Sequence, residues 1–363
     1  MARPRWRRLG AFCAKLLVSL LIFVAGLELG TRLLSPSDRF EVLPNTFDPV
    51  TGVRQVPHGR GFVRCPEYEI TITINGAGLR DDRDYPYARP PGRRRLLCLG
   101  DSFTFGLGVH VHETFAKVLE DLLADGTEVL NSGLVGTGTA EQLAWYETNG
   151  RLWQPDLVVL AFCVNDWTDN TKSGLFSLAA DSTLVQHLAV EHGTLRRLRL
   201  LRRLPGYADW FARSHFVNRF REWFAVVHHG RLAAAAAGTR TPDEIWRHER
   251  ALTEALLRRL REACRQDGAG LLVMPIPALP GSGEPEQRLE ELMAFLRREG
   301  FASLDLHTAF AGDEAAGGIS GTGGGSASLY YPVDGHWTAA GHALAARELA
   351  GWYSELSRSR PRR

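Results

Sequence analysis

The chain has 363 residues, of which 44% are hydrophobic and 23% are charged, and this composition is typical of a folded globular protein. The formal net charge is +2, but nine of the 43 basic residues lie near the two ends, so the body of the chain is acidic overall. A surface that binds nucleic acid needs the opposite balance, and we therefore expect no nucleic-acid partner.

The N-terminal region is expected to anchor the chain in a membrane. Residues 9–27 are almost all apolar, with Lys15 as an interruption near the start, and a helix of about 20 such residues crosses the bilayer core. Four arginines precede this run, so the positive-inside rule predicts a cytoplasmic basic tip and a single membrane span over residues 1–32. The rest of the chain would then lie outside the cytoplasm, in the periplasm or at the cell exterior.

A cleaved signal peptide is the alternative interpretation of the same region. Its charged start fits, but Val24-Ala25-Gly26 is a poor cleavage site and Glu28 follows almost at once. We therefore favour an uncleaved anchor.

Residues 33–92 are expected to form a membrane-proximal segment. Between Tyr68 and Ile74 apolar and polar residues alternate with a period of two, which predicts a half-buried strand. The stretch 81–95 is charged and contains three prolines, so we expect a linker there.

From residue 93 to residue 356 the pattern alternates between strands and helices. Apolar runs predict strands at 96–99, 127–130, 157–162, 271–274 and 302–306. Helical patterns are found at 115–123, 140–149, 243–266, 289–298 and 338–356. This alternation predicts an α/β domain in which helices cover both faces of a parallel sheet. Residues 357–363 follow as a basic tail.

Residues 170–241 interrupt the alternation and are expected to form a helical insertion. Five apolar residues in it share one helical face: Phe216, Phe220, Trp223, Phe224 and Val227. This stripe is compatible with a lid over an active site, a helix on a membrane surface or a small separate core. Further on, the glycine-rich stretch 312–328 is of low complexity, and we expect a mobile loop.

The five cysteines are scattered and include no Cys-x-x-Cys pair, so the sequence supports neither a zinc ribbon nor a redox motif. Cys98 and Cys163 are expected on neighbouring strands, where a disulfide is conceivable but two buried thiols are favoured. We expect no metal and no organic cofactor.

Ser102 is the candidate nucleophile. It follows the predicted strand 96–99 within Gly100-Asp101-Ser102 and precedes a helix. A serine at this point lies at the carboxyl edge of the sheet, where open α/β folds place their chemistry. A serine becomes a nucleophile only beside a base. Without one, Ser102 would have the alternative role of a helix N-cap.

Two segments that follow the next predicted strands could stabilise an oxyanion. Gly136 lies in the glycine-rich turn after strand 127–130, and a glycine lets the backbone N–H approach a substrate oxygen. Asn165 follows strand 157–162, and its amide can donate to the same oxygen. An ordinary glycine turn and an Asx turn are the alternatives.

The sequence Asp334-Gly335-His336 opens the last predicted helix and offers a base. His336 is the candidate general base, and Asp334 is the candidate for orienting its imidazole and stabilising the imidazolium. His342, six residues later, is the reserve candidate.

These segments, in this order, resemble the SGNH hydrolase superfamily, also called GDSL-like esterases and lipases, over about residues 93–355 without the insertion. Its name letters match Ser102, Gly136, Asn165 and His336. The resemblance implies a flavodoxin-like three-layer α/β/α sandwich with a five-stranded parallel sheet. It also implies an oxyanion hole made by the backbone N–H groups of Ser102 and Gly136 and by the Asn165 amide.

Two departures from the family pattern are visible. The first segment has Phe103 where the family name has leucine, a position that tolerates variation. The acid and base are spaced Asp-x-His instead of the commoner Asp-x-x-His, and some members use a backbone carbonyl in place of the acid.

We therefore expect a membrane-anchored serine esterase that cleaves ester bonds, O-acyl esters above all, through an acyl-enzyme on Ser102. Its substrate would be an ester or an acylated glycan or lipid. The main alternative is an O-acyltransferase or deacetylase that modifies cell-envelope polysaccharide. A catalytically silent binding module on the same fold is a further alternative.

Overall fold

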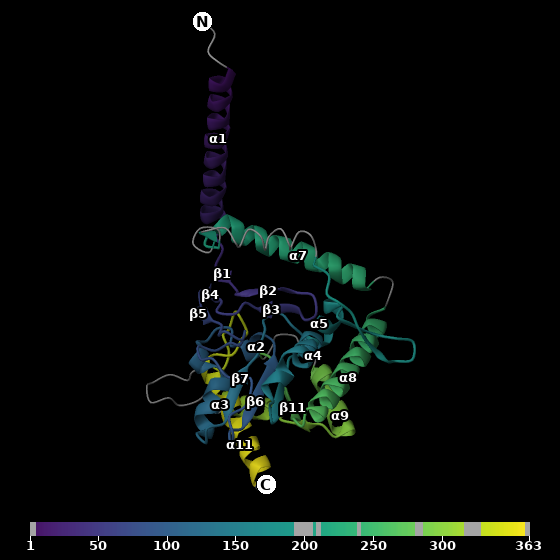
Figure 1. The fold of residues 1–363 in the computed structure, drawn as a ribbon. Coiled ribbons are helices and arrows are strands. Elements are labelled where there is room, and N and C mark those ends of the chain that lie inside the picture. Colours follow the sequence, from purple (N-terminus) through teal and green to yellow (C-terminus); the bar gives the residue numbers. More distant parts are fainter. Residues whose placement is uncertain are drawn as a thin grey trace.

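A five-stranded parallel sheet lies at the centre of the computed structural model, which describes residues 5–191, 206–207, 212–237, 241–279, 286–315 and 328–359 (Figure 1). In spatial order its strands are β12 (Ala302–Ser303), β11 (Gly270–Pro275), β8 (Leu157–Phe162), β6 (Arg95–Gly100) and β7 (Glu128–Asn131). Every neighbouring pair is parallel. When the five strands are numbered along the chain and read from β7 to β12, their order is 2-1-3-4-5. This is the flavodoxin-like order, so the predicted fold is confirmed.

The sheet is buried on both faces, as the continuous apolar runs of β6 and β8 predict. Alternate residues of β6 point to opposite sides: Leu97 and Leu99 join one core, and Leu96 and Cys98 join the other. The first core is closed by α4 (Thr139–Thr148), α5 (Asp166–Ser173), α8 (Pro242–Gln266) and α9 (Glu286–Glu299). The second is closed by α3 (Phe115–Leu123), α10 (His307–Ala315) and α11 (Ala339–Ser359).

Local signals fix where these helices begin. Thr114 accepts a hydrogen bond from the Lys117 backbone N–H and caps α3. Thr241 and Glu244 form a capping box at the start of α8. β12 is shorter than the predicted strand 302–306, because Asp305 accepts a hydrogen bond from the His307 N–H and starts α10.

The membrane-proximal segment is folded and is antiparallel. One sheet has the order β1 (Phe40–Val42), β4 (Arg60–Arg64), β5 (Glu69–Thr73), and a separate hairpin pairs β2 (Asn45–Asp48) with β3 (Gly52–Gln55). The predicted strand 68–74 is confirmed as β5. Its alternate residues Ile70 and Ile72 are buried against Phe105, the last residue of α2 (Ser102–Phe105), and against Leu107, which follows that helix.

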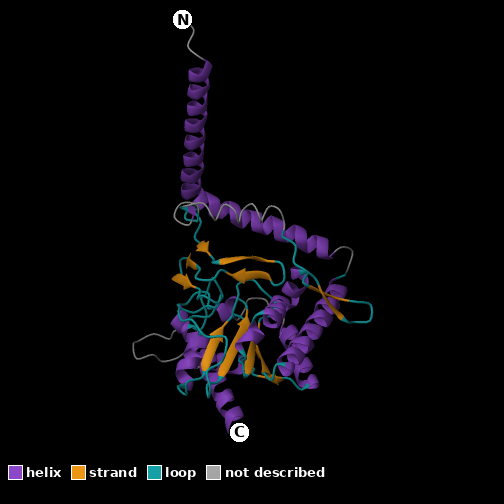
Figure 2. Ribbon diagram, viewed as in Figure 1, coloured by secondary structure: helices purple, strands orange, loops and turns teal. Residues whose placement is uncertain are grey.

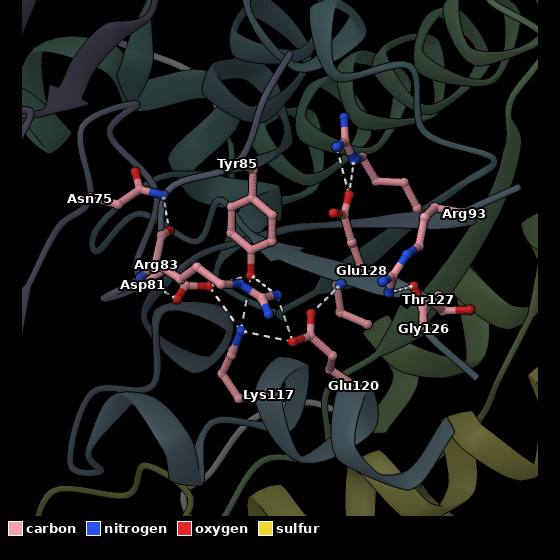
Figure 3. Close-up of polar contacts among 12 residues, drawn as sticks. Asn75, Asp81, Arg83, Tyr85, Arg93, Lys117, Glu120, Gly126, Thr127 and Glu128 are labelled. Carbon is pink, nitrogen blue, oxygen red and sulfur yellow. Dashed lines mark hydrogen bonds and ion pairs between the residues drawn. The ribbon is translucent and has the colours of Figure 1, made fainter. Parts of the chain in front are cut away.

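The stretch 81–95 differs from the expected linker. Outside β6 it has no helix or strand, but Asp81 and Tyr85 are buried and bind α3 (Figure 3). The Lys117 ammonium lies 3.0 Å from Asp81 Oδ2, 2.9 Å from the Tyr85 hydroxyl and 3.2 Å from Glu120 Oε1. Charged residues are buried here because each meets a partner.

The described part of the insertion is a mixture of strands and helix. It contains the hairpin of β9 (Phe176–Leu178) and β10 (Leu184–Gln186) and the long helix α7 (His215–Ala237). The three-residue strands of the hairpin were not predicted. Residues 192–205, 208–211 and 238–240 lie outside the described residues, as do 316–327 of the predicted loop and 360–363 of the tail.

The N-terminal helix α1 (Arg5–Leu34) projects away from the α/β domain, and α7 lies across its end (Figures 1 and 2). From Leu9 onward α1 is long and apolar enough to cross a membrane, and none of its apolar stretch is buried. The Glu28 carboxylate, near the end of α1, accepts hydrogen bonds from the Ser214 hydroxyl and from the backbone N–H groups of His215 and Phe216. The end of α1 is therefore joined to the start of α7.

No disulfide is formed by any of the five cysteines, all of which lie in the described part of the chain. Cys98 and Cys163 are buried, which agrees with the favoured interpretation, and burial raises the pKa of the Cys98 thiol to about 12.

The Lys117 contacts give a first prediction. Burial by itself raises the pKa of Asp81, but the Lys117 charge and hydrogen bonds from Tyr85 and the Arg83 N–H outweigh it and lower that pKa. We expect Lys117→Met to lower the free energy of unfolding by about 3 kcal/mol, because it leaves a buried carboxylate without its cation. Asp81→Asn combined with Lys117→Met should recover part of this loss. Thermal unfolding of the detergent-solubilised protein measures both, and a single variant as stable as the native protein would contradict the prediction.

Candidate active site

Ser102 lies where the sequence analysis places it, at the carboxyl end of β6 and in the first turn of α2. The N-cap of α2 is Asp101, whose Oδ1 accepts a hydrogen bond from the Phe103 N–H at 2.9 Å. The capping role considered for Ser102 therefore belongs to its neighbour. The Ser102 Oγ lies 2.8 Å from Nε2 of His336, within hydrogen-bond reach.

His336 and Asp334 are brought together by a tight turn between Tyr331 and His336. The Tyr331 N–H donates to the His336 carbonyl at 2.9 Å, and the Gly335 N–H donates to the Tyr331 carbonyl at 2.8 Å. Gly335 has a φ of 79°, a left-handed conformation that glycine adopts readily. The turn places Asp334 Oδ1 2.9 Å from Nδ1 of His336, so the two-residue spacing permits this contact.

The second oxygen of the Asp334 carboxylate contacts the membrane-proximal segment. Oδ2 accepts a hydrogen bond from the Tyr68 hydroxyl and lies 3.2 Å from Nη1 of Arg39. The Glu67 carboxylate accepts hydrogen bonds from the backbone N–H groups of Asp334 and Val333, at 2.7 and 2.9 Å. The sequence does not predict Arg39, Glu67 or Tyr68 at this site. They form no motif, and 266 to 295 residues separate them from their partners.

These contacts keep Asp334 ionised. Burial by itself raises the pKa of its carboxyl, but the hydrogen bond and charge of His336, the Tyr68 hydroxyl and the Arg39 charge outweigh burial. The net result is a pKa well below the usual value of an aspartate. A negative charge therefore faces the imidazole across the neutral pH range.

The two predicted oxyanion segments lie beside Ser102 at the same edge of the sheet. The Leu134 N–H donates to the Gly100 carbonyl at 3.0 Å, which fixes the turn that contains Gly136 against the end of β6. Gly136 has a φ of 76° and open space where a side chain would be. Among the described residues, no acceptor bonds the backbone N–H of Ser102 or of Gly136.

Asn165 is also at this edge, at the start of α5. Its Nδ2 donates to Oδ2 of Asp169 at 2.9 Å, and the side chain also helps to stabilise the Asp101 carboxylate beside Ser102. The amide group therefore points to carboxylates in this structure.

Two buried carboxyls lie under the site. Burial raises the pKa of Asp101. It also raises the pKa of Asp166, to which the nearby Asp101 charge adds. Asp166 Oδ2 accepts a hydrogen bond from the Thr139 hydroxyl at 2.7 Å, whereas its buried Oδ1 has no hydrogen-bond partner among the residues that the structure describes. A protonated Asp166 fits these surroundings better than a carboxylate does. Within the described residues, no group of three or more histidine, cysteine or acidic side chains is arranged to hold a metal ion.

His342, the reserve base, is buried elsewhere in the helix layer. Its Nδ1 accepts a hydrogen bond from the Phe115 N–H at 3.2 Å, and burial, assisted by the His336 charge, lowers its pKa to about 3. A neutral histidine that bonds the start of α3 has a packing role. His336 is the histidine that reaches Ser102.

The fold is similar to several solved structures. One is a member of the lipolytic protein G-D-S-L family from Veillonella parvula, with 11% identity and a TM-score of 0.40 over 72% of this chain and 98% of that chain. A second is a catalytic mutant of Axe2, an acetylxylan esterase from Geobacillus stearothermophilus, with 18% identity and a TM-score of 0.38 over 70% and 92%. A third is a lipase/acylhydrolase from Enterococcus faecalis, with 17% identity and a TM-score of 0.36 over 71% and 96%. No curated protein matches the chain.

A family model describes the core of the chain. The model of the GDSL-like Lipase/Acylhydrolase family matches residues 98–344, which is more than half of the chain. The matched region includes Ser102, Gly136, Asn165 and the Asp334–His336 turn. It does not include Arg39, Glu67 or Tyr68.

The different surroundings of the two histidines give a second prediction. His336→Gln should abolish labelling by a fluorophosphonate probe of activated serines and should lower the free energy of unfolding by about 1 kcal/mol, because it breaks the contact with Asp334. His342→Gln should lower the free energy of unfolding by about 1 to 3 kcal/mol through the Phe115 N–H, but it should leave labelling of the folded protein intact. Loss of labelling in a well-folded His342→Gln variant would mean that the base has been assigned to the wrong histidine.

Proposed function

Because this chain belongs to the GDSL-like lipase/acylhydrolase family and is thus a hydrolase acting on ester bonds, we propose that it is a serine esterase working through an acyl-enzyme on Ser102. The observation that carries the proposal is the 2.8 Å distance between the Ser102 Oγ and Nε2 of His336. A serine becomes a nucleophile when a base lies within hydrogen-bond reach and is itself oriented by a third group. Asp334, at 2.9 Å from Nδ1, is that group.

In the proposed reaction the Ser102 Oγ attacks the ester carbonyl carbon while Nε2 of His336 takes the hydroxyl proton. The imidazolium is stabilised by Asp334 and then gives the proton to the leaving alcohol oxygen, as the ester C–O bond breaks. Water attacks the acyl carbon of the resulting acyl-enzyme while His336 takes a proton from it. The imidazolium then returns this proton to the Ser102 Oγ as the bond between Oγ and the acyl carbon breaks and the carboxylic acid leaves. This sequence needs two oriented groups beside Ser102 and no cofactor.

The backbone N–H groups of Ser102 and Gly136 and the amide of Asn165 are the proposed oxyanion donors. Both N–H groups lack an acceptor within the described part of the chain, so an incoming oxygen can accept from them without displacing a protein partner. The Asn165 amide would have to turn from Asp169 towards the substrate. Each such donor contributes about 3 kcal/mol to stabilising the transition state.

The favoured substrates are O-acyl esters, carried by a small molecule, a glycan or a lipid. The second candidate function is O-acyl transfer or deacetylation on cell-envelope polysaccharide. The candidate membrane helix α1 favours it, because an anchor would hold the site close to envelope polymers. Hydrolysis and transfer share the acyl-enzyme and differ in whether water or a sugar hydroxyl accepts the acyl group. A catalytically silent binding module would not require Ser102, His336 and Asp334 to lie in contact, so their geometry favours an enzyme.

The nucleophile assignment gives a third prediction. Ser102→Ala should abolish fluorophosphonate labelling and lower kcat on short acyl esters by at least about 1000-fold, because no covalent intermediate can form. Asn165→Ala should lower kcat by about 100-fold while labelling persists. Equal labelling of the native protein and the Ser102→Ala variant would remove the proposal. Product analysis with an acetyl ester, with and without an acceptor glycan, then separates hydrolysis from transfer.

We propose further that α1 stays attached and crosses the cell membrane once, with its basic start in the cytoplasm and the α/β domain outside. The length and apolar character of α1, and the exposure of its apolar stretch, support this placement. The bonds from Glu28 to Ser214, His215 and Phe216 support retention of the helix, because they make its end part of the folded structure.

In the same proposal, α7 lies along the membrane surface. It crosses the end of α1 (Figure 1), and its residues Phe220, Trp223 and Val226 are 48%, 60% and 73% exposed. Other side chains of the helix hold it against the protein: Arg221 donates to the Glu41 carbonyl, and Glu222 accepts from the Ser37 hydroxyl. A small separate core would bury these apolar side chains, whereas a bilayer surface covers them.

Fluorescence in lipid vesicles gives a fourth prediction. In the full chain reconstituted with lipids whose acyl chains are brominated, tryptophan emission should be quenched, and Trp223→Phe should remove a measurable part of that quenching. Trp352→Phe is the matched control, because α11 ends at the opposite end of the molecule from α1 (Figure 1), and it should leave the quenched fraction unchanged. Equal effects of the two variants would place α7 away from the bilayer.

A further inference from the structure

The Asp334 carboxylate is bound at both oxygens, and only one of its partners belongs to the proposed catalytic set. Oδ1 contacts Nδ1 of His336, while Oδ2 accepts from the Tyr68 hydroxyl and pairs with Arg39 at 3.2 Å. The side chain is 9% exposed, so little of this binding can be replaced by bulk water. The orientation of the carboxylate is therefore set from two sides.

The backbone of the same residue is held by the same segment. The Glu67 carboxylate accepts the N–H groups of Val333 and Asp334, one with each oxygen. The Val333 side chain is 87% exposed, so packing of that side chain does not hold the outer part of the turn. The turn is fixed by these polar contacts instead.

The small sheet that carries these residues is attached firmly next to the nucleophile. Arg39 precedes β1, and Tyr68 precedes β5, and both strands pair with β4. The buried face of this sheet packs on Phe105, the last residue of α2, and on Leu107 just after it. The sheet therefore contacts the Ser102 helix and the Asp334 turn at the same time.

Resting on the proposed function, we propose that Tyr68 and Arg39 are positioning residues of the esterase, assisted by Glu67. They hold the Asp334 carboxylate so that its Oδ1 orients the His336 imidazole towards Ser102. The membrane-proximal segment, which lies before the family-matched region, thus completes the active site.

The physical reason lies in the rotation of the carboxylate. The Asp334 carboxylate is carried by a short and partly exposed turn, Asp334-Gly335-His336. Such a carboxylate can rotate or turn towards solvent unless its second oxygen is held. A hydroxyl and a guanidinium on Oδ2 remove that freedom and keep the group charged. A catalytic group that is displaced slightly loses much of its effect, so loss of these contacts should appear in kcat.

A double-mutant cycle on the full chain tests this inference. Tyr68→Phe removes the hydroxyl but keeps the ring that packs on Tyr331, and it should lower kcat by about 10-fold with KM unchanged. In an Asp334→Asn background the same substitution should change kcat by less than about 2-fold, because the group through which Tyr68 acts is already impaired. Arg39→Lys should retain more activity than Arg39→Gln, because it keeps the positive charge.

Tyr146→Phe is the matched control. It removes a tyrosine hydroxyl that donates to Oδ2 of Asp267, at the end of α8 and away from the proposed site, so kcat should stay within about 2-fold of the native value. Equal losses from Tyr68→Phe in the native and Asp334→Asn backgrounds would overturn the inference, as would an unchanged kcat in the first. The Ser102→Ala variant keeps the two proposals apart: if it loses labelling and activity while the cycle is additive, the esterase stands and only the positioning role fails.

Discussion

The burial of the central sheet on both faces is the constraint on which the site depends. β6 and β8 are wholly buried, so their interiors have no room for a polar side chain without a partner. Polar groups can appear only where the strands end, and parallel strands end together at one edge. The segments after β6, β7 and β8 consequently bring Ser102, Gly136 and Asn165 to the same place, although the sequence separates them widely. His336 comes from a different source, the turn before α11, and is held against that edge by backbone bonds.

Three aspartates lie around this edge, and their different surroundings shift their pKa values in different directions. Asp334 meets a histidine, a tyrosine and an arginine, and its pKa is lowered. Burial raises the pKa of Asp101 and Asp166, and at Asp166 neighbouring carboxylates add to the effect. The carboxylate with the lowered pKa is thereby placed beside the imidazole, while burial of Asp166 disfavours a second negative charge under the serine. Such a separation of pKa values is the pattern expected where acid–base chemistry is carried out.

The sequence was informative where a local signal determines the structure. Apolar runs such as 157–162 predict buried strands, and the observed β8 has the same bounds. The sequence also predicted where the candidate site residues lie. Ser102, Gly136 and Asn165 come after predicted strands, and His336 comes before the last predicted helix. The linker expected at 81–95 was misinterpreted, because its charges look solvated until Lys117 is seen beside Asp81. Tyr68 and Arg39 gave no signal, because a contact across 266 or 295 residues leaves no period or motif in the chain.

The same long-range contacts change the meaning of the N-terminal part of the chain. Ser37 donates its N–H to Nδ1 of His215 and its hydroxyl to the Arg39 carbonyl, and the His215 N–H in turn donates to Glu28 of α1. A continuous set of hydrogen bonds therefore runs from the end of the candidate membrane helix to the residue that pairs with Asp334. A flexible tether would let the α/β domain turn freely relative to the bilayer. Here each step fixes backbone or buries a polar group. In the proposed membrane placement, one connected structure would therefore set both the position of the domain at the bilayer and the geometry of the Asp334–His336 pair. In the proposed enzyme, the orientation of the site relative to the bilayer is thus determined by the fold itself.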